Sequence, residues 1–217
     1  GTWNDNFCAA PADIMRVAGG VVTDLKRGQL RRLPFLTSYD FTVAKSIRDQ
    51  LSGGTRTSVG QAEHVLRKAL TSVSVRREIY DLFLDDEPVV AMRASYVAMK
   101  VAHSEPATTE EFKKLILKNL SNYTQQEVRW HVPQLLVHMK LTPAERRKAY
   151  DAVMEWSETD ASKIVAYYGL QAAANFAEVD DALLEDLIPR LRKLNARGAK
   201  SVSNRCRKIA KQLEIEL

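Results

Sequence analysis

The residues with the clearest potential for chemistry are three metal-ligand types on one stretch of the chain. Glu127, His131 and His138 follow one another at intervals of four and seven residues, so a helix would project them from one side. A metal site normally needs three or four convergent ligands with second-shell support. These three are one and two turns apart and cannot all reach one ion unless a second helix contributes. The pattern therefore favours a solvated helix face, and we expect no metal or other cofactor.

Motifs for covalent or phosphate chemistry are lacking in the sequence. Gly19-Gly20 and Gly53-Gly54 have neither the lysine nor the strand context of a phosphate-binding loop. Ser157 has no glycine frame of the kind that surrounds a nucleophilic serine. The carboxylate pair Asp180-Asp181 stands where a helix should begin, which is typical of a cap. We therefore expect no catalytic residues and a protein that is not an enzyme.

A cluster of basic residues near the C-terminus is a candidate phosphate-binding surface. The stretch from Arg190 to Leu213 has nine basic residues and no acidic ones, which leaves the rest of the chain at −4 against a total of +5. The residues that we single out for phosphate contact are Arg205, Arg207, Lys208 and Lys211. Two structural explanations compete with nucleic-acid binding, because bases complement the dipole at a helix C-terminus and a terminal repeat needs a charged outer face.

A helix with the same pattern of apolar residues recurs along the chain and should position these candidates. Counted from Val90, Val128, Val165 and Val202, which are 38, 37 and 37 residues apart, positions 0, 4, 7, 8 and 11 are apolar or small in every copy. Those offsets form one stripe on an α-helix. A buried stripe that returns at a fixed interval indicates stacked units, none of which can cover its apolar face alone.

A second set of helices should alternate with the first. Thr108-Thr109-Glu110-Glu111 and Thr142-Pro143-Ala144-Glu145 both match the capping box of a hydroxyl followed three residues later by Glu. The sequence predicts this set over residues 75–85, 110–121, 143–157 and 182–197. Each helix is followed by a short polar link and then by one of the valine-phased helices.

These helix pairs resemble HEAT-like repeats of the armadillo/HEAT superfamily. Pro189 adds to the resemblance, because HEAT repeats commonly bend their first helix with a proline. The segments that carry it are Val89–Ala102, Glu127–Met139, Ile164–Ala177 and Ser201–Leu213, each with the preceding helix. The resemblance implies an all-α fold, a right-handed α-solenoid (superhelix) of about four to five HEAT-like helix pairs.

The first third of the chain fits the repeat less well. We expect an N-terminal helical cap over residues 1–36, with helices at Pro11–Lys26 and Leu30–Leu36. Residues 37–74 should form an irregular first helix pair from Asp40–Leu51 and Thr57–Val73. Residues 75–217 should form four HEAT-like repeats in one continuous solenoid.

The side of each valine-phased helix opposite the stripe is the candidate binding surface. In a helical solenoid the second helix of each pair normally lines the concave face, and offsets 2, 6 and 9 should point there. The three rows are Met92, Trp130, Tyr167, Asn204; Tyr96, Gln134, Gln171, Lys208; and Met99, Val137, Ala174, Lys211. Aromatic residues and Met are enriched where proteins bind proteins. We therefore expect a groove for a helix or extended segment of a protein partner, although superhelical curvature could instead tuck these side chains against neighbouring repeats.

The expected contacts are of two kinds. Partner side chains would insert between Met92, Tyr96, Trp130 and Tyr167, while His131, Gln134, Tyr168 and Gln171 would supply orienting hydrogen bonds.

An enzymatic alternative follows from the resemblance, since HEAT-like DNA glycosylases that recognise alkylated bases form one branch of the superfamily. There Trp130, Trp156 and Tyr167 would stack on the extruded base and Asp160 or Glu127 would stabilise the sugar cation. The chain lacks the aromatic–Arg–Arg run with a nearby Asp expected of such enzymes.

Composition limits the class of protein further. With 45% apolar and 27% charged residues the chain has a globular rather than a disordered balance. No run approaches the roughly 18 apolar residues needed to cross a bilayer, so we expect no membrane partner. Two cysteines, Cys8 and Cys206, suit a reduced cytoplasmic setting better than a disulfide framework. Oligomeric state is left open.

Overall fold

The computed structural model describes residues 45–217, which belong to one compact unit, Val43–Leu217. Within this range the chain is helical throughout, with turns between the helices and no β-strand. The expected cap over 1–36, with its helices Pro11–Lys26 and Leu30–Leu36, lies outside the described residues, as does Cys8. The prediction of an all-α fold is confirmed for the described part.

The helices follow one another with short connections. In chain order they are α2 (Ile47–Leu51), α3 (Ala62–Thr71), α4 (Val73–Asp81), η3 (Leu82–Leu84), α5 (Pro88–Ser104), η4 (Pro106–Phe112), α6 (Lys113–Asn119), η5 (Leu120–Asn122), α7 (Gln126–Leu136), α8 (Pro143–Thr159), α9 (Lys163–Ala177), α10 (Asp181–Arg197) and α11 (Lys200–Gln212), where η marks a 3₁₀-helix.

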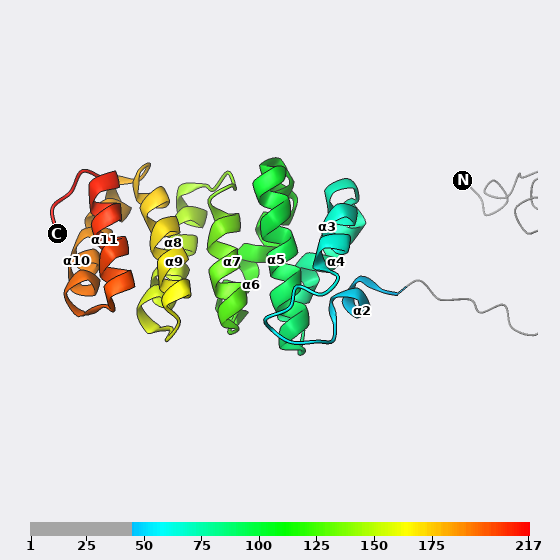
Figure 1. Cartoon of the computed structure of the whole chain (residues 1–217). Helices are drawn as coiled ribbons and strands as arrows, with labels where there is room; N and C mark the ends of the chain where they lie inside the picture. Colours follow the sequence, from blue (N-terminus) through cyan, green and yellow to red (C-terminus); the bar gives the residue numbers. More distant parts are fainter. Residues whose placement is uncertain (1–44) are drawn as a thin grey trace, which may run out of the picture. The chain divides into compact units, whose positions relative to one another are not determined.

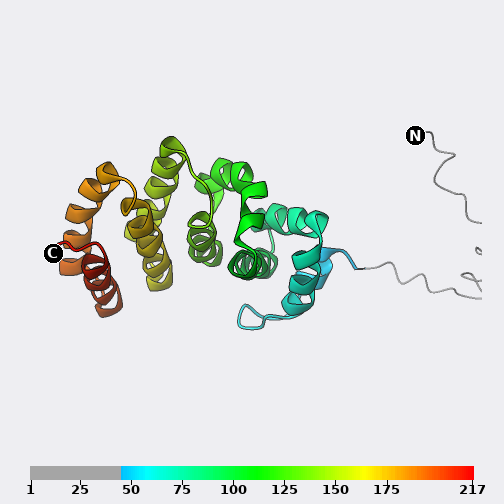
Figure 2. The ribbon, with the colours of Figure 1, turned by 90° about the horizontal axis from the view of Figure 1, so that it is seen from above.

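These helices form two layers, which Figures 1 and 2 show from two sides. One layer is a row of successive neighbours, in which α5 packs against α3 and α7, and α9 packs against α7 and α11. We call α5, α7, α9 and α11 the second helices. The other layer contains α4, α6, α8 and α10, the first helices, of which α4, α8 and α10 pack against the second helix of their own pair. Each second helix therefore lies between two others or at the end of the row.

The recurring stripe is the core between these helices. All four phasing valines and the residues 4, 7 and 8 positions after each of them are buried. At offset 11, Val101, Met139 and Phe176 are also buried, whereas Leu213 near the chain end is only partly covered. The prediction that one helix face recurs as the core is confirmed, because α5, α7 and α9 each bury this stripe against neighbours.

Local capping differs between the two predicted capping boxes. The box at Thr142 is present, since its hydroxyl accepts from Glu145 N and Glu145 accepts from Thr142 N. The box at Thr108 is absent. Thr108 and Thr109 lie inside η4, where their hydroxyls donate back to carbonyl oxygens three residues earlier, at 2.7 Å in both cases. The predicted helix over 110–121 is therefore split into η4, α6 and η5.

Other helix limits also differ from expectation. Of the helix predicted over residues 40–51, the described residues are helical only in α2, from Ile47 to Leu51. The helix predicted over 57–73 begins only at Ala62, because the residues from 57 to 61 make turns that include Gly60, whose φ is positive. Helix α7 ends at Leu136 rather than Met139, and turns carry the chain from there toward α8.

The pair α8–α9 shows why one stripe position is glycine. Gly169 occupies the place taken by Ala94, Val132 and Cys206 in the other second helices. A Cβ on Gly169 would lie 2.2 Å from Ser157 Oγ and 2.8 Å from Val153 O, far inside contact distance. Only a residue without a side chain lets the two helix backbones approach this closely.

We expect Gly169→Ala to lower the free energy of unfolding by about 1–3 kcal/mol, because overpacking against the Val153 carbonyl outweighs the gain in helix propensity. Urea denaturation of the variant and the wild type measures the difference. Adding Ser157→Ala should recover only part of the loss, since the carbonyl contact remains. A Gly169→Ala protein as stable as the wild type would contradict the packing described.

Candidate partner-binding face

The predicted contact residues gather around two hollows, one on each side of α7. The small hollow has a volume of about 130 Å³. It is lined by Met92, Arg93, Tyr96, Trp130 and His131 together with residues 56–59 of the loop before α3. The large hollow has a volume of about 360 Å³. It is lined by His103, Pro133, Gln134, Val137, His138, Tyr167, Tyr168, Gln171, Ala172, Asn175 and Arg205.

A buried arginine that the sequence analysis did not single out builds one wall of the small hollow. Arg93 is 2% exposed, and its guanidinium donates to the carbonyl oxygens of Leu51 at 2.7 Å, Gly53 at 2.7 Å and Ser58 at 3.0 Å. It thereby holds the loop between α2 and α3 against α5. A side chain at Gly60 would meet Arg93 Cζ at 2.8 Å, so this loop needs glycine there. The sequence did offer one signal for this buried residue, since Arg93 is an isolated arginine within the apolar run of α5.

His131 is a buried structural residue rather than a contact for a partner. The indole N–H of Trp130 donates to His131 Nε2 at 2.8 Å, so Nδ1 carries the ring proton and donates to Ser95 Oγ, also at 2.8 Å. The Ser95 hydroxyl in turn donates to Met92 O at 3.0 Å. Because both ring nitrogens are occupied, the prediction that His131 offers a hydrogen bond to a partner is wrong. Its role is to fix the indole ring of Trp130.

Glu127 is likewise used inside the protein. The residue is 3% exposed, and its carboxylate accepts from Arg56 Nε at 2.9 Å and from Gln125 Nε2 at 3.2 Å. Burial by itself would raise the pKa of Glu127, but these hydrogen bonds outweigh it and lower that pKa. Glu127, His131 and His138 do not converge, and no group of three or more potential metal ligands occurs within residues 45–217.

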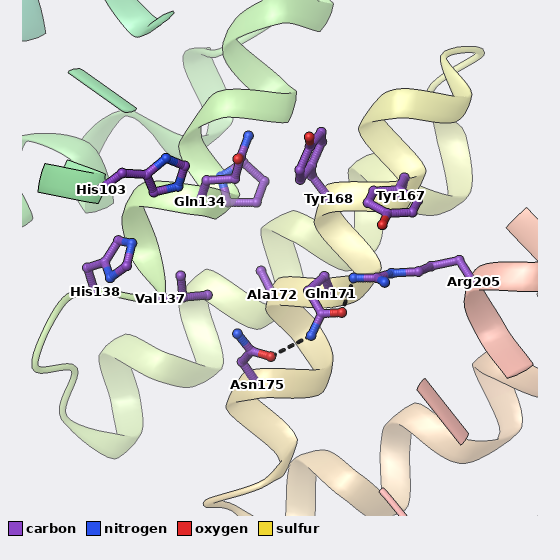
Figure 3. Close-up of a pocket in the computed structure, with 11 residues that line it drawn as sticks. His103, Gln134, Val137, His138, Tyr167, Tyr168, Gln171, Ala172, Asn175 and Arg205 are labelled. Atoms are coloured by element: carbon purple, nitrogen blue, oxygen red, sulfur yellow. Dashed lines mark hydrogen bonds between the residues drawn. The ribbon is translucent and has the colours of Figure 1, made fainter. Parts of the chain in front are cut away.

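The large hollow is organised by Arg205 of α11, which reaches across to α9 (Figure 3). Its guanidinium lies over the ring of Tyr167, with Cζ 4.2 Å from the ring centroid, and donates to Gln171 Oε1. Gln171 in turn donates to Asn175 Oδ1 at 2.7 Å. Tyr167 remains 39% exposed, with Tyr168 in an edge-to-face contact beside it at 5.2 Å. Two aromatic rings and a stacked guanidinium thus form an amphipathic wall.

A pair of histidines at the opposite end of the large hollow was missed by the sequence analysis. The rings of His103 and His138 meet edge to face, 5.9 Å apart, although the residues are 35 positions apart in the chain. Burial and then the charge of His103 lower the pKa of His138. His103 lies in the last turn of α5 and His138 in the turn that follows α7, so their spacing in the sequence did not indicate the contact.

The third predicted row and the base-stacking set need correction. Met99 is 9% exposed and Ala174 is fully buried, so neither faces outward. Their helices have neighbours on several sides, which buries more of the helix circumference than one stripe.

The residues expected to stack on a base are also engaged inside the protein. Trp156 is 2% exposed beneath Arg129 and cannot stack on a base. Asp160 pairs with Arg129 at 3.0 Å and accepts from Ser162 N, which is a structural role.

The C-terminal basic cluster divides into bound and unbound members. Arg190 is paired with Glu158 at 2.8 Å and with Asp186 at 3.2 Å, and Arg192 donates to Glu216 O. Arg207 donates to Asn204. Lys208 and Lys211 are exposed and make no ion pair with another described residue. The candidates Arg205 and Arg207 already have neutral partners, whereas both lysines are available for an anion.

Comparison with known proteins gives no family for this chain: no family model, no curated protein and no solved structure matches it. No helix of the described part combines the length and apolar character needed to cross a membrane. Cys206 is buried in α11 and forms no disulfide with any described residue.

We expect His131 to make the stability of the protein depend on pH. Burial lowers the pKa of His131 to about 3, against about 6.5 in the unfolded chain. Between these values the unfolded state binds more protons, so this stabilisation is complete above about pH 6.5 and is lost as the pH falls toward 3. The measurement is urea denaturation of wild type and His131→Gln at a series of pH values. The stability difference between them should shrink by about 1 kcal/mol for each pH unit below 6; a constant difference would contradict the neutral, buried imidazole.

Proposed function

We propose that this protein is a non-catalytic, HEAT-like helical repeat scaffold that binds a protein or peptide partner. In this proposal the helix pairs continue as a right-handed solenoid and the second helices line its concave face. The row of second helices, the first helices packed on one side of it and the recurring buried stripe support the repeat architecture. A cytoplasmic location, expected from the cysteine usage, is part of the same proposal.

One observation carries the binding function: an exposed aromatic residue stands at the edge of a hollow large enough for a side chain. Tyr167 is 39% exposed on α9, beside the hollow of about 360 Å³. The second hollow, at about 130 Å³, is smaller than the usual small-molecule site of roughly 300–1,000 Å³. A cavity of about 150 Å³ can accept a benzene ring. The small hollow therefore suits a side chain of a macromolecule better than a diffusible substrate. The volume of the large hollow falls within the small-molecule range, and we assign it to a partner side chain because the exposed ring of Tyr167 stands at its edge.

Tyr167→Ala should weaken binding of the partner by about 2 kcal/mol, the size of effect at an interface hot spot. The partner would first be isolated from native cell extract with the full chain, and the affinities of the purified pair would then be measured by calorimetry. Trp130→Ala is a less clean variant, since it also leaves His131 Nε2 without its donor and should lower stability.

Val73→Ala is the matched control, because Val73 is 51% exposed but lies at the start of α4, a first helix. It should leave the affinity unchanged. If wild type and Tyr167→Ala bound the partner with equal affinity, the face formed by the second helices would be excluded as the binding site.

A second candidate function, nucleic-acid binding, is favoured by the exposed lysines of α11. Lys208 and Lys211 are separated by three positions on the same helix face, as phosphate contacts would require. The glycosylase-like alternative within this class has less support, since Trp156, Asp160 and Glu127 are all engaged internally.

Nucleic-acid binding predicts retention on duplex DNA that falls steeply with salt. Replacing Lys208 and Lys211 by Gln should then reduce the slope of log affinity against log salt by about 2, one unit for each phosphate contact. Lys114→Gln with Lys118→Gln on α6 changes the net charge equally and should leave the slope unaltered. Absence of retention near physiological salt would exclude this candidate.

A further inference from the structure

The charges of the protein are divided between the two helix layers. Helices α5, α7, α9 and α11 together contain nine lysines and arginines but a single carboxylate, Glu127. The first helices α4, α6, α8 and α10 contain both signs, with twelve basic and nine acidic residues. Since Glu127 is buried and paired with Arg56, the exposed part of the second helices carries no negative charge at all.

Most of the basic residues in the second helices are not neutralised within residues 45–217. Arg93 is bound by backbone carbonyls and Arg129 by Asp160. The others make no ion pair with a described residue, and all but Arg205 are exposed; they are Lys100, Lys163, Lys200, Arg205, Arg207, Lys208 and Lys211. Apart from Glu63 of α3, which accepts from the Tyr96 hydroxyl at 3.2 Å beside the small hollow, this surface favours an anionic partner and disfavours a cationic one.

The large hollow shares this lack of negative charge. Its described lining includes Arg205 and two histidines but no Asp or Glu. Arg205 has only the neutral Gln171 and the ring of Tyr167 as side-chain partners, and its Nε–H is buried without a hydrogen-bond acceptor among the described residues. An unpaired buried donor is costly. Because this Nε–H is enclosed, it is the unneutralised charge of the half-buried guanidinium, and not this donor, that suits the carboxylate of a partner.

Resting on the function proposed above, we infer that the partner of this face is an acidic peptide segment with apolar anchor residues. One anchor enters the large hollow beside Tyr167, and a carboxylate next to it pairs with Arg205. A second, smaller anchor enters the small hollow between Met92 and Trp130. Further acidic residues of the segment lie along Lys208 and Lys211.

The position of the two hollows sets the spacing of the anchors. They lie on either side of α7, in the grooves toward α5 and α9. Neighbouring helix axes are about 8–10 Å apart, so the anchors should be separated by a distance on the order of 10 Å. An extended chain covers this distance in about three residues.

Nucleic acid fits this surface less well than an acidic peptide does. Arg205 already covers one face of the exposed Tyr167 ring, and the indole of Trp130 is held half-buried by His131. Stacking platforms for bases need free ring faces. The small hollow, at about 130 Å³, also has room for a side chain and not for a base with its sugar.

The test is selection of a phage-displayed library of random linear peptides on the full chain. We expect the enriched peptides to be rich in Asp and Glu, with two apolar residues about three positions apart. A synthetic peptide of the consensus should bind Lys208→Glu with Lys211→Glu at least tenfold more weakly than wild type at low salt. The control pair Lys114→Glu with Lys118→Glu on α6 carries the same net charge and should bind as the wild type does.

Each other outcome overturns a specific part. Neutral or basic enriched peptides whose binding is lost in Tyr167→Ala would overturn the acidic partner and leave the scaffold function standing. Enriched peptides that bind Tyr167→Ala as well as wild type would overturn both. Failure to enrich any peptide, together with salt-dependent retention on duplex DNA, would also overturn both in favour of nucleic-acid binding. Thermal unfolding midpoints within a few degrees of wild type establish that the variants are folded.

Discussion

Burial of an apolar stripe on each second helix is the constraint on which the structure depends. The residues at stripe positions in α5, α7 and α9 are buried because each helix has neighbours on both sides along the row. Removing such a helix from its neighbours would expose this surface to water at about 25 cal/mol per Å². The same constraint decides which surface of the second helices stays available to a partner. What the stripe leaves uncovered is the side of the second helices that carries Met92, Trp130 and Tyr167, and the two hollows lie in the grooves along that side.

Buried polar groups give this exposed side its shape. Arg93 fastens the loop before α3, Arg56 with Glu127 joins the same loop to α7, and the Ser95–His131–Trp130 chain fixes the indole ring. Each of these groups has found its partners inside the protein, as buried polar groups must. Their consequence for binding is preorganisation, since a fixed wall loses little conformational entropy when a partner docks.

Ion pairs and unpaired bases occupy different parts of the molecule. Arg129–Asp160, Arg146–Asp180 and Arg190–Glu158 each join residues about one repeat apart and so connect successive helix pairs. Partly exposed pairs of this kind contribute little stability individually, but they hold neighbouring pairs in register. Because the acidic residues are concentrated in the first helices and the turns, the second helices keep an uncompensated positive charge on the side that a partner would meet.

Periodicity alone determined the helical layers and the buried face of each second helix, because a repeated 3.6-residue pattern has only one way to hide its apolar side. It also placed Met92, Tyr96, Trp130 and Tyr167 on one surface. The tertiary structure decided how far each of them is exposed, since that depends on which neighbours cover a helix. It also made His131 internal, brought His103 beside His138 and set Arg205 over Tyr167. Contacts of this kind join side chains from different helices, and spacing along one chain does not specify them.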